Sequence, residues 1–200
     1  MKIAVLVSGR GSNLKAILDS PDLKFLAKVV CVVSDKPDCP AFKIAEQNQI
    51  KTFIIGKEAA QLSYSDLAAI FSESGVQLIV LAGFLKLIPA DFIARFENKI
   101  INIHPALLPS FGGKGMYGLN VHKAVFDSSA KVSGATVHFV DTTYDTGKII
   151  AQGCTDISDV ESPEEIAERV LKVEHKILPE VIKAFAEGKI KRLNNRVVFT

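Results

Sequence analysis

The order of apolar and polar positions predicts alternating strands and helices over the first half of the chain. Short runs rich in β-branched residues indicate strands at 2–8, 28–34, 52–55, 78–83 and 100–103. Helical segments are expected between them, near 13–19, 40–48, 65–74 and 89–96. Continuously apolar strands that alternate with helices indicate a mostly parallel sheet covered by helices on both faces.

The second half departs from this rhythm. Two apolar runs, 134–141 and 147–157, are joined by a polar turn too short for a crossover helix, so they are expected to pair antiparallel. A long helix is predicted from Pro163 towards Ala186, because Ser162 can cap it and proline suits its first position. Two short strands are expected around 194–195.

No linker, repeat or low-complexity segment interrupts the chain. The fold class predicted is α/β, a single Rossmann-like domain over residues 1–200 with a mostly parallel sheet, helices on both faces and an antiparallel C-terminal portion. Two hundred residues at 48% hydrophobic are enough to bury one sizeable core.

Charge and hydropathy narrow the class of partner. The chain has 24 basic and 22 acidic residues and no long basic run, so nucleic acid is not expected as a partner. No stretch approaches the roughly 20 apolar residues of a membrane span, and we expect a cytoplasmic protein. Cys31, Cys39 and Cys154 form no metal-binding motif. Cys31 and Cys154 lie in apolar runs, which predicts buried free thiols.

A glycine-rich turn, SGRGSNL, follows the first strand and opens the first helix. Gly9 and Gly11 permit close backbone approach, and Ser12 and Asn13 add polar groups, so the exposed amides indicate a phosphate site. A dinucleotide site would need a third glycine at position 14, where this chain has leucine. Asp35 nevertheless matches the ribose-binding acid of such folds. A purely structural turn is the alternative.

Two polar side chains stand at the end of the fifth predicted strand, in INIHP. Asn102 and His104 share one face because strand side chains alternate, and Pro105 disfavours further pairing. Open α/β sheets bind ligands at the carboxyl ends of their strands, which favours a functional pair. The alternative is a pair of polar groups satisfied by loop backbone.

Several motifs together resemble the folate-dependent formyltransferases. SGRGSNL, VLAGFLKLI, INIHPALLPSF, TVHFVD with DTG, and VEHKILPEVI occur in the order found in the glycinamide ribonucleotide transformylase branch, over residues 2–185. The Asn-x-His-Pro strand end is shared by the whole family, and the glycine turn points to that branch. The loop after His104 is longer than in compact members, which leaves the contacts of residues 112–118 open.

The resemblance implies transfer of a formyl group from 10-formyltetrahydrofolate, as co-substrate, to the amine of glycinamide ribonucleotide in purine synthesis, with no metal. It implies that Asn102 and a cationic His104 stabilise an oxyanion, and that Asp145 raises the imidazole pKa and assists proton transfer. His138 is implied to position its neighbours, with a satisfied structural histidine as the alternative.

The resemblance also implies where each small molecule binds. Residues 1–100 form the phosphate-binding half, and residues 101–188 the folate and catalytic half. The ribonucleotide would contact Gly11, Ser12, Asn13 and Glu174. The folate would contact Leu85, Lys86, Leu87, Ile88, Asn102, Val140 and Asp141. For Glu174 the alternative is a surface carboxylate, and for the leucines and isoleucine it is ordinary core.

Small-molecule substrates are therefore the expected partners, and the protein is expected to be a monomer or a homodimer. Two competing functions remain at this stage. One is a nucleotide-binding sensor without catalysis, which leaves Asn102, His104 and Asp145 unexplained. The other is a different folate formyltransferase that acts on a nucleotide-linked sugar amine.

Overall fold

The structure, a computed structural model, describes residues 1–58, 60–194 and 196–200. The chain forms two compact units, Met1–Asn102 and Ile103–Thr200. This division lies beside the expected division of the chain near residue 100, and the single-domain organisation stays a prediction.

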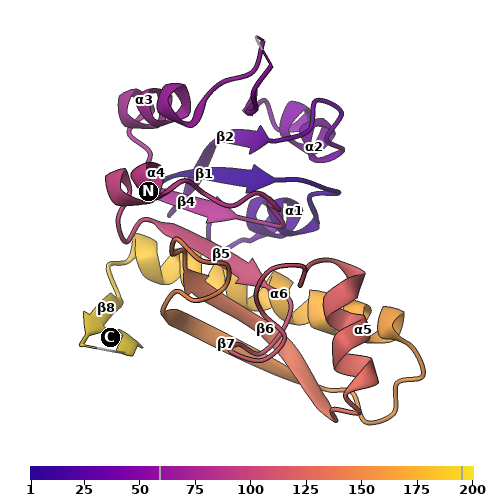
Figure 1. Ribbon diagram of the computed structural model, residues 1–200. Coiled ribbons are helices and arrows are strands. Elements are labelled where there is room, and N and C mark those ends of the chain that lie inside the picture. The colour runs from indigo at the N-terminus through magenta and orange to yellow at the C-terminus, as the bar shows by residue number, and fades with distance from the viewer. Residues whose placement is uncertain (59, 195) are drawn as a thin grey trace. The chain divides into compact units, whose positions relative to one another are not determined.

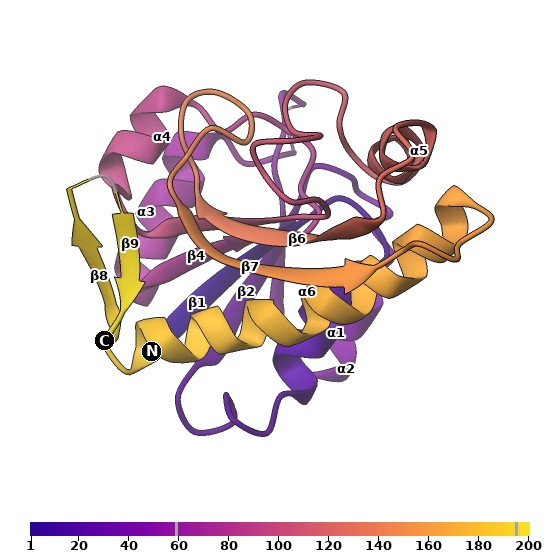
Figure 2. The same ribbon diagram turned by 90° about the horizontal axis from the view of Figure 1, so that it is seen from below.

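The first unit is a parallel sheet with helices. Its elements are β1 (Lys2–Val7), α1 (Ser12–Asp19), β2 (Lys28–Ser34), α2 (Ala41–Gln47), β3 (Lys51–Ile54), α3 (Tyr64–Ser74), β4 (Leu78–Leu81), α4 (Ala90–Arg95) and the start of β5 (Ile100–His104). The strands follow the order β3-β2-β1-β4-β5, and all four neighbouring pairs are parallel. Figure 2 shows α1 and α2 on one side of the sheet and α3 and α4 on the other.

The strand order reverses between β1 and β4, which makes their carboxyl ends the switch point of this sheet. The side chains of β4 are all buried, and so are those of β1 after its first residue. This continuous burial is why the sequence shows apolar runs here rather than alternation.

The second unit contains the antiparallel portion. Its elements are α5 (Leu119–Asp127), β6 (Val132–Phe139), β7 (Ile149–Asp156), α6 (Pro163–Ala186), β8 (Ile190–Leu193) and β9 (Arg196–Phe199). β6 and β7 pair antiparallel, and α6 packs along both of them (Figure 1). α6 begins with Ser162 as its cap and continues through Pro179. The α/β class with an antiparallel C-terminal portion is therefore confirmed.

Two features of the structure differ from the sequence-based expectations. The region of α5 had no predicted helix, because a short apolar stretch directly after several glycines carries a weak helical signal. The prediction of a buried Cys154 is wrong: its thiol is exposed on β7, where side chains of alternate positions face solvent. Cys31 is buried as expected, and burial raises the pKa of its thiol to about 12.

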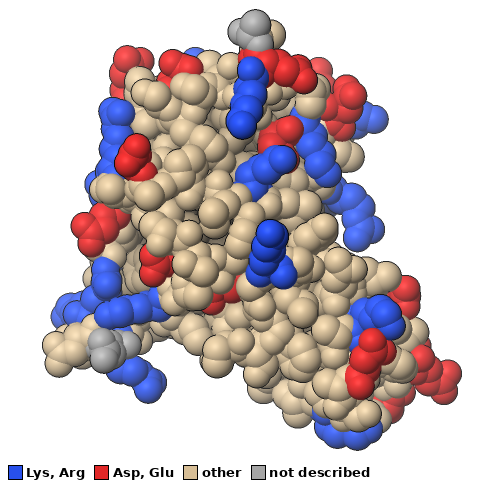
Figure 3. Space-filling view, in the orientation of Figure 1, with Lys and Arg blue, Asp and Glu red and all other residues tan. Residues whose placement is uncertain are grey.

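The surface carries charges of both signs. On the face drawn in Figure 3, basic and acidic side chains are interspersed over an otherwise uncharged surface. Among the described residues, no helix combines the length and the apolar character that crossing a membrane requires.

Candidate active site

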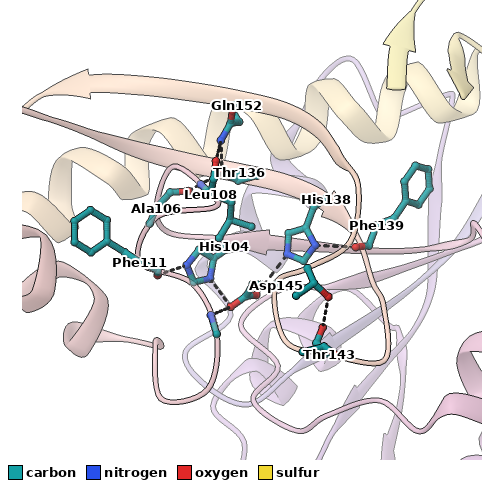
Figure 4. A network of polar contacts seen from close by, with 12 residues as sticks. His104, Ala106, Leu108, Phe111, Thr136, His138, Phe139, Thr143, Asp145 and Gln152 are labelled. Carbon is teal, nitrogen blue, oxygen red and sulfur yellow. Dashed lines mark hydrogen bonds and ion pairs between the residues drawn. The ribbon is translucent and has the colours of Figure 1, made fainter. Parts of the chain in front are cut away.

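A largely buried carboxylate lies between two imidazoles in the second unit (Figure 4). Asp145 Oδ2 is 3.5 Å from His104 Nδ1, and Asp145 Oδ1 is 3.5 Å from His138 Nε2. The Gly113 N–H donates to the same Oδ2 at 2.8 Å. His104 comes from the end of β5, His138 from β6 and Asp145 from the turn before β7, so three separate segments build this cluster.

A backbone carbonyl contacts each buried imidazole at the ring nitrogen that faces away from Asp145. His104 Nε2 is 2.9 Å from the Phe111 carbonyl oxygen, and His138 Nδ1 is 2.7 Å from the Phe139 carbonyl oxygen. Each imidazole therefore has an acceptor oxygen at both ring nitrogens, and only a doubly protonated ring could donate to both. These contacts fix the orientation of both rings. Which ring nitrogens carry protons depends on the charges around them.

Asp145 occupies an unusual backbone conformation. Its φ is 58°, in the left-handed region that a residue with a side chain seldom adopts. Gly112 makes room beside it, since an added Cβ there would lie 2.5 Å from Leu108 Cδ2 and 3.2 Å from Asp145 Cβ. Backbone strain of this kind persists where the surroundings enforce it and is frequent at functional sites.

The charges of the cluster follow from burial and its neighbours. For Asp145, burial raises the pKa, but the hydrogen bond with His138, the charge of His104 and the Gly113 N–H outweigh it. The net pKa lies below the ordinary value, so this carboxylate is ionised at neutral pH.

The expected cationic His104 is not what the free protein favours. Burial of the ring lowers its pKa more than Asp145 and the Phe111 carbonyl raise it, and His138 adds a further lowering. The expectation that Asp145 stabilises the charged ring has the right sign, but burial is the larger effect. His104 is therefore mainly neutral at neutral pH, with an ionised carboxylate beside it.

A second polar network fixes the chain directly after His104. The buried Thr136 hydroxyl donates to the Ala106 carbonyl at 2.6 Å and accepts from the Leu108 N–H at 3.0 Å. Gln152 Nε2 donates to the Leu108 carbonyl at 2.9 Å and lies 3.0 Å from the same hydroxyl. β6 and β7 thus hold the segment that connects His104 to the glycine-containing loop (Figure 4).

The glycine turn lies in the first unit, at the carboxyl end of β1. Gly11 is the residue before α1, has a φ of 80°, and provides no side chain to cap the helix amides. A Cβ on Gly11 would lie 2.7 Å from Ala41 Cβ, so this glycine is also required by packing against α2. Gly9 has open space where a Cβ would stand. A helix start that no side chain caps fits an anion.

The other expected binding residues differ in accessibility. Leu85 and Leu87 are 40% and 45% exposed, as side chains that line an open slot would be, whereas Ile88 is 2% exposed and belongs to the core of the first unit. Lys86 is exposed, and the turn at Val140 and Asp141 leads from β6 to Asp145. Glu174 is buried in α6, which removes the surface-carboxylate alternative.

Several groups that support the cluster carry no distinct signal in the sequence. Thr136 and Gln152 were not singled out, although Thr136 shares a strand face with His138 by alternation. The contributions of Phe111 and Gly113 are backbone groups, which no side-chain pattern can reveal. His122 on α5 is also buried, and burial followed by the charge of His104 lowers its pKa to about 4.

Comparisons with known proteins agree with this architecture. Residues 1–182 match the formyl transferase family. The chloroplastic phosphoribosylglycinamide formyltransferase of Arabidopsis thaliana is 45% identical over 95% of this chain and 67% of its own length. That of Haemophilus influenzae is 38% identical over 97% of this chain and 91% of its own length.

Solved structures show the same fold. A crystal structure of phosphoribosylglycinamide formyltransferase from Anaplasma phagocytophilum superposes with a TM-score of 0.90 at 33% identity, covering 100% of this chain and 94% of that one. Both kinds of match extend over nearly all of the sequence. They favour a formyl transferase over the alternative of a nucleotide-binding sensor. The chain therefore belongs to the formyl transferase family and is an enzyme of that family.

Proposed function

We propose that this protein transfers the formyl group of 10-formyltetrahydrofolate to the amine of phosphoribosylglycinamide, a step of purine biosynthesis. The observation that carries the proposal is the ionised Asp145 held between His104 and His138, beside the strand end that bears Asn102. Relatives named for this reaction match most of the chain, which supports the choice of substrate.

The reaction needs hydrogen-bond donors for a developing negative charge. The substrate amine attacks the formyl carbon, a new C–N bond forms, and the carbonyl oxygen becomes an oxyanion in a tetrahedral intermediate. We assign the Asn102 amide and the His104 Nε2–H as its donors, because both belong to one face of β5. The formyl oxygen would replace the Phe111 carbonyl as the partner of His104 Nε2.

A proton must then travel from the attacking amine to N10 of the folate as the C–N10 bond breaks. The His104 Nε2–H remains with the oxyanion, so a water held by Asp145 accepts that proton, and the carboxylate stabilises the positive charge that develops. His138 and the Gly113 N–H hold the carboxylate in place. The same water then delivers the proton to N10 of the folate.

Binding of the two small molecules is assigned to the glycine turn and to exposed apolar groups. The phosphate would contact the backbone of Gly11, Ser12 and Asn13, and Glu174 would accept from ribose hydroxyls. The pterin of the folate would lie against Leu85 and Leu87, with backbone groups of Lys86 and Ile88 and the turn at Val140–Asp141 recognising its polar edge.

A direct assay tests this function. Purified protein with phosphoribosylglycinamide and 10-formyltetrahydrofolate should yield tetrahydrofolate and the formylated ribonucleotide in equal amounts. His104→Ala should abolish most of that turnover and serves as the control for contaminating activity. Formylation of another nucleotide-linked sugar amine, with none of phosphoribosylglycinamide, would overturn the proposed substrate.

A further inference from the structure

A buried serine joins three segments of the first unit. The Ser8 hydroxyl donates to Asp35 Oδ1 at 2.6 Å and accepts from the Leu85 N–H at 3.0 Å. The Ser8 backbone N–H donates to the Gly83 carbonyl at 3.0 Å. Ser8 is only 3% exposed, so water does not replace these partners easily.

Ser8 lies between the two segments to which the ligands are assigned, the glycine turn and the segment after β4. Ser8 directly follows β1 and directly precedes Gly9, the first glycine of the turn. Leu85 begins the exposed segment after β4, to which the folate is assigned. β1 and β4 are the two strands at the switch point of the sheet, where ligands of open α/β folds bind.

Asp35 gives the hydroxyl a direction. A serine hydroxyl has one proton and can rotate. In Ser8 the short hydrogen bond to Asp35 uses that proton and fixes the direction of the O–H. The oxygen lone pairs are then left for the Leu85 N–H. Asp35 therefore acts on the segment after β4 through Ser8, which explains the acid after β2 without a dinucleotide.

We propose that Ser8 is a positioning residue that sets the placement of the formyl-donor segment relative to the phosphate turn, with Asp35 orienting its hydroxyl. The inference rests on the proposed function, because it takes the turn as the phosphate site and the segment after β4 as the folate site. The turn has additional supports of its own, since Cys39 Sγ lies 3.3 Å from the Gly9 carbonyl and Gly11 packs on Ala41. Loss of the Ser8 hydroxyl should therefore release the folate segment more than the turn.

Calorimetry of Ser8→Ala with each ligand alone tests this separation. The dissociation constant of tetrahydrofolate should rise about tenfold, the effect of one lost hydrogen bond to the Leu85 N–H. That of phosphoribosylglycinamide should change less than about twofold. Ser8→Thr keeps the hydroxyl and should restore the folate affinity, and Asp35→Ala should give an intermediate loss.

Ser34→Ala is the matched control. Ser34 is a fully buried serine at the end of neighbouring β2, and its hydroxyl also accepts one backbone N–H, that of Lys36 at 3.1 Å. Ser34→Ala should lower the melting temperature comparably and leave folate binding unchanged. Equal folate losses in Ser8→Ala and Ser34→Ala, or equal losses of both ligands in Ser8→Ala, would overturn the proposal.

If Ser8→Ala does not fold, Asp35→Ala replaces it in the test. This variant should also bind tetrahydrofolate more weakly and phosphoribosylglycinamide unchanged, because Asp35 orients the Ser8 hydroxyl. If the wild-type protein formylates a different amine, the proposed substrate is wrong while the folate arm still reports on Ser8. If it formylates phosphoribosylglycinamide and the two affinities do not separate, the role of Ser8 alone is wrong.

Discussion

Single side chains set the chemistry of this protein through their surroundings. Asp145 remains ionised although it is largely buried, because His138, His104 and the Gly113 N–H offset the cost of burial. His104 beside it is mainly neutral, because for the ring burial is the larger effect. The pair is thus prepared to take up positive charge as a reaction proceeds.

Asp145→Asn tests this electrostatic relation. The variant removes the charge that raises the pKa of His104, so the titration of that ring should move to still lower pH in NMR spectra. Turnover should fall by about 10²–10⁴, the range for loss of acid–base assistance. Adding His104→Ala should cost little more if the two act as one unit. An unmoved His104 titration, or fully multiplicative losses, would contradict the mechanism.

The two glycines of the turn predict contrasting variants. Gly9→Val places a side chain in open space, so the fold should be kept while phosphoribosylglycinamide binds about tenfold more weakly. Gly11→Ala meets Ala41 at a positive φ and should destabilise the protein by about 1–3 kcal/mol. Calorimetry and thermal unfolding separate the two effects. Unchanged ribonucleotide affinity in Gly9→Val would move the phosphate site elsewhere.

At the scale of elements, β6 and β7 hold the loop that follows β5. Thr136 and Gln152 satisfy the backbone of Ala106 and Leu108 inside the second unit. These bonds fix the start of the loop, and the Phe111 carbonyl and Gly113 N–H further along it contact His104 and Asp145. The strand pair therefore supports the cluster as well as the core.

Thr136→Val removes this support with little change in shape. It leaves the Leu108 N–H and the Ala106 carbonyl without the hydroxyl, which should cost about 1–3 kcal/mol in the free energy of unfolding. Turnover should fall too, because the loop carries backbone partners of His104 and Asp145, the groups proposed to act in catalysis. Thr136→Ser keeps the hydroxyl and should retain most of the stability and activity; urea unfolding and steady-state kinetics measure both. Full activity in Thr136→Val would show that the loop is positioned by other contacts.

For the whole molecule, buried histidines and exposed ion pairs have unequal effects on stability. The Lys15–Asp19 and Lys123–Asp127 pairs are exposed on both sides, and such pairs contribute little. His122 is buried, its Nδ1 has no hydrogen-bond partner in the described structure, and its pKa is lowered to about 4. Acid should therefore destabilise the protein partly through this residue.

The sign follows from proton uptake. Between about pH 6.5 and 4 the unfolded chain binds a proton at His122 that the folded protein does not, so stability is lost as the pH falls through this range. The loss from His122 at pH 4.5 should be on the order of 2 kcal/mol. His122→Leu should lose less stability than the wild type between pH 7 and 4.5 in urea unfolding. Equal losses in both proteins would contradict the assignment.

The sequence by itself determined the local elements. β2 and α6 have the expected bounds, because β-branched runs and a complete set of helix-start residues are signals contained in the segment itself. The period of two placed Asn102 and His104 on one face of the strand that the structure contains. The motifs within these elements were also sufficient to indicate the family, which the comparisons confirm.

Only the tertiary structure decided which groups meet and which proton states they favour. Asp145 approaches His104 and His138 through a left-handed backbone and a glycine-lined loop, neither of which a strand or helix pattern encodes. The neutral state of His104 depends on burial by distant segments, and burial is a property of the packed chain rather than of local sequence. Packing also decided that Glu174 is buried and Cys154 is exposed. Which side of a helix or strand faces the interior is set only when the elements pack together.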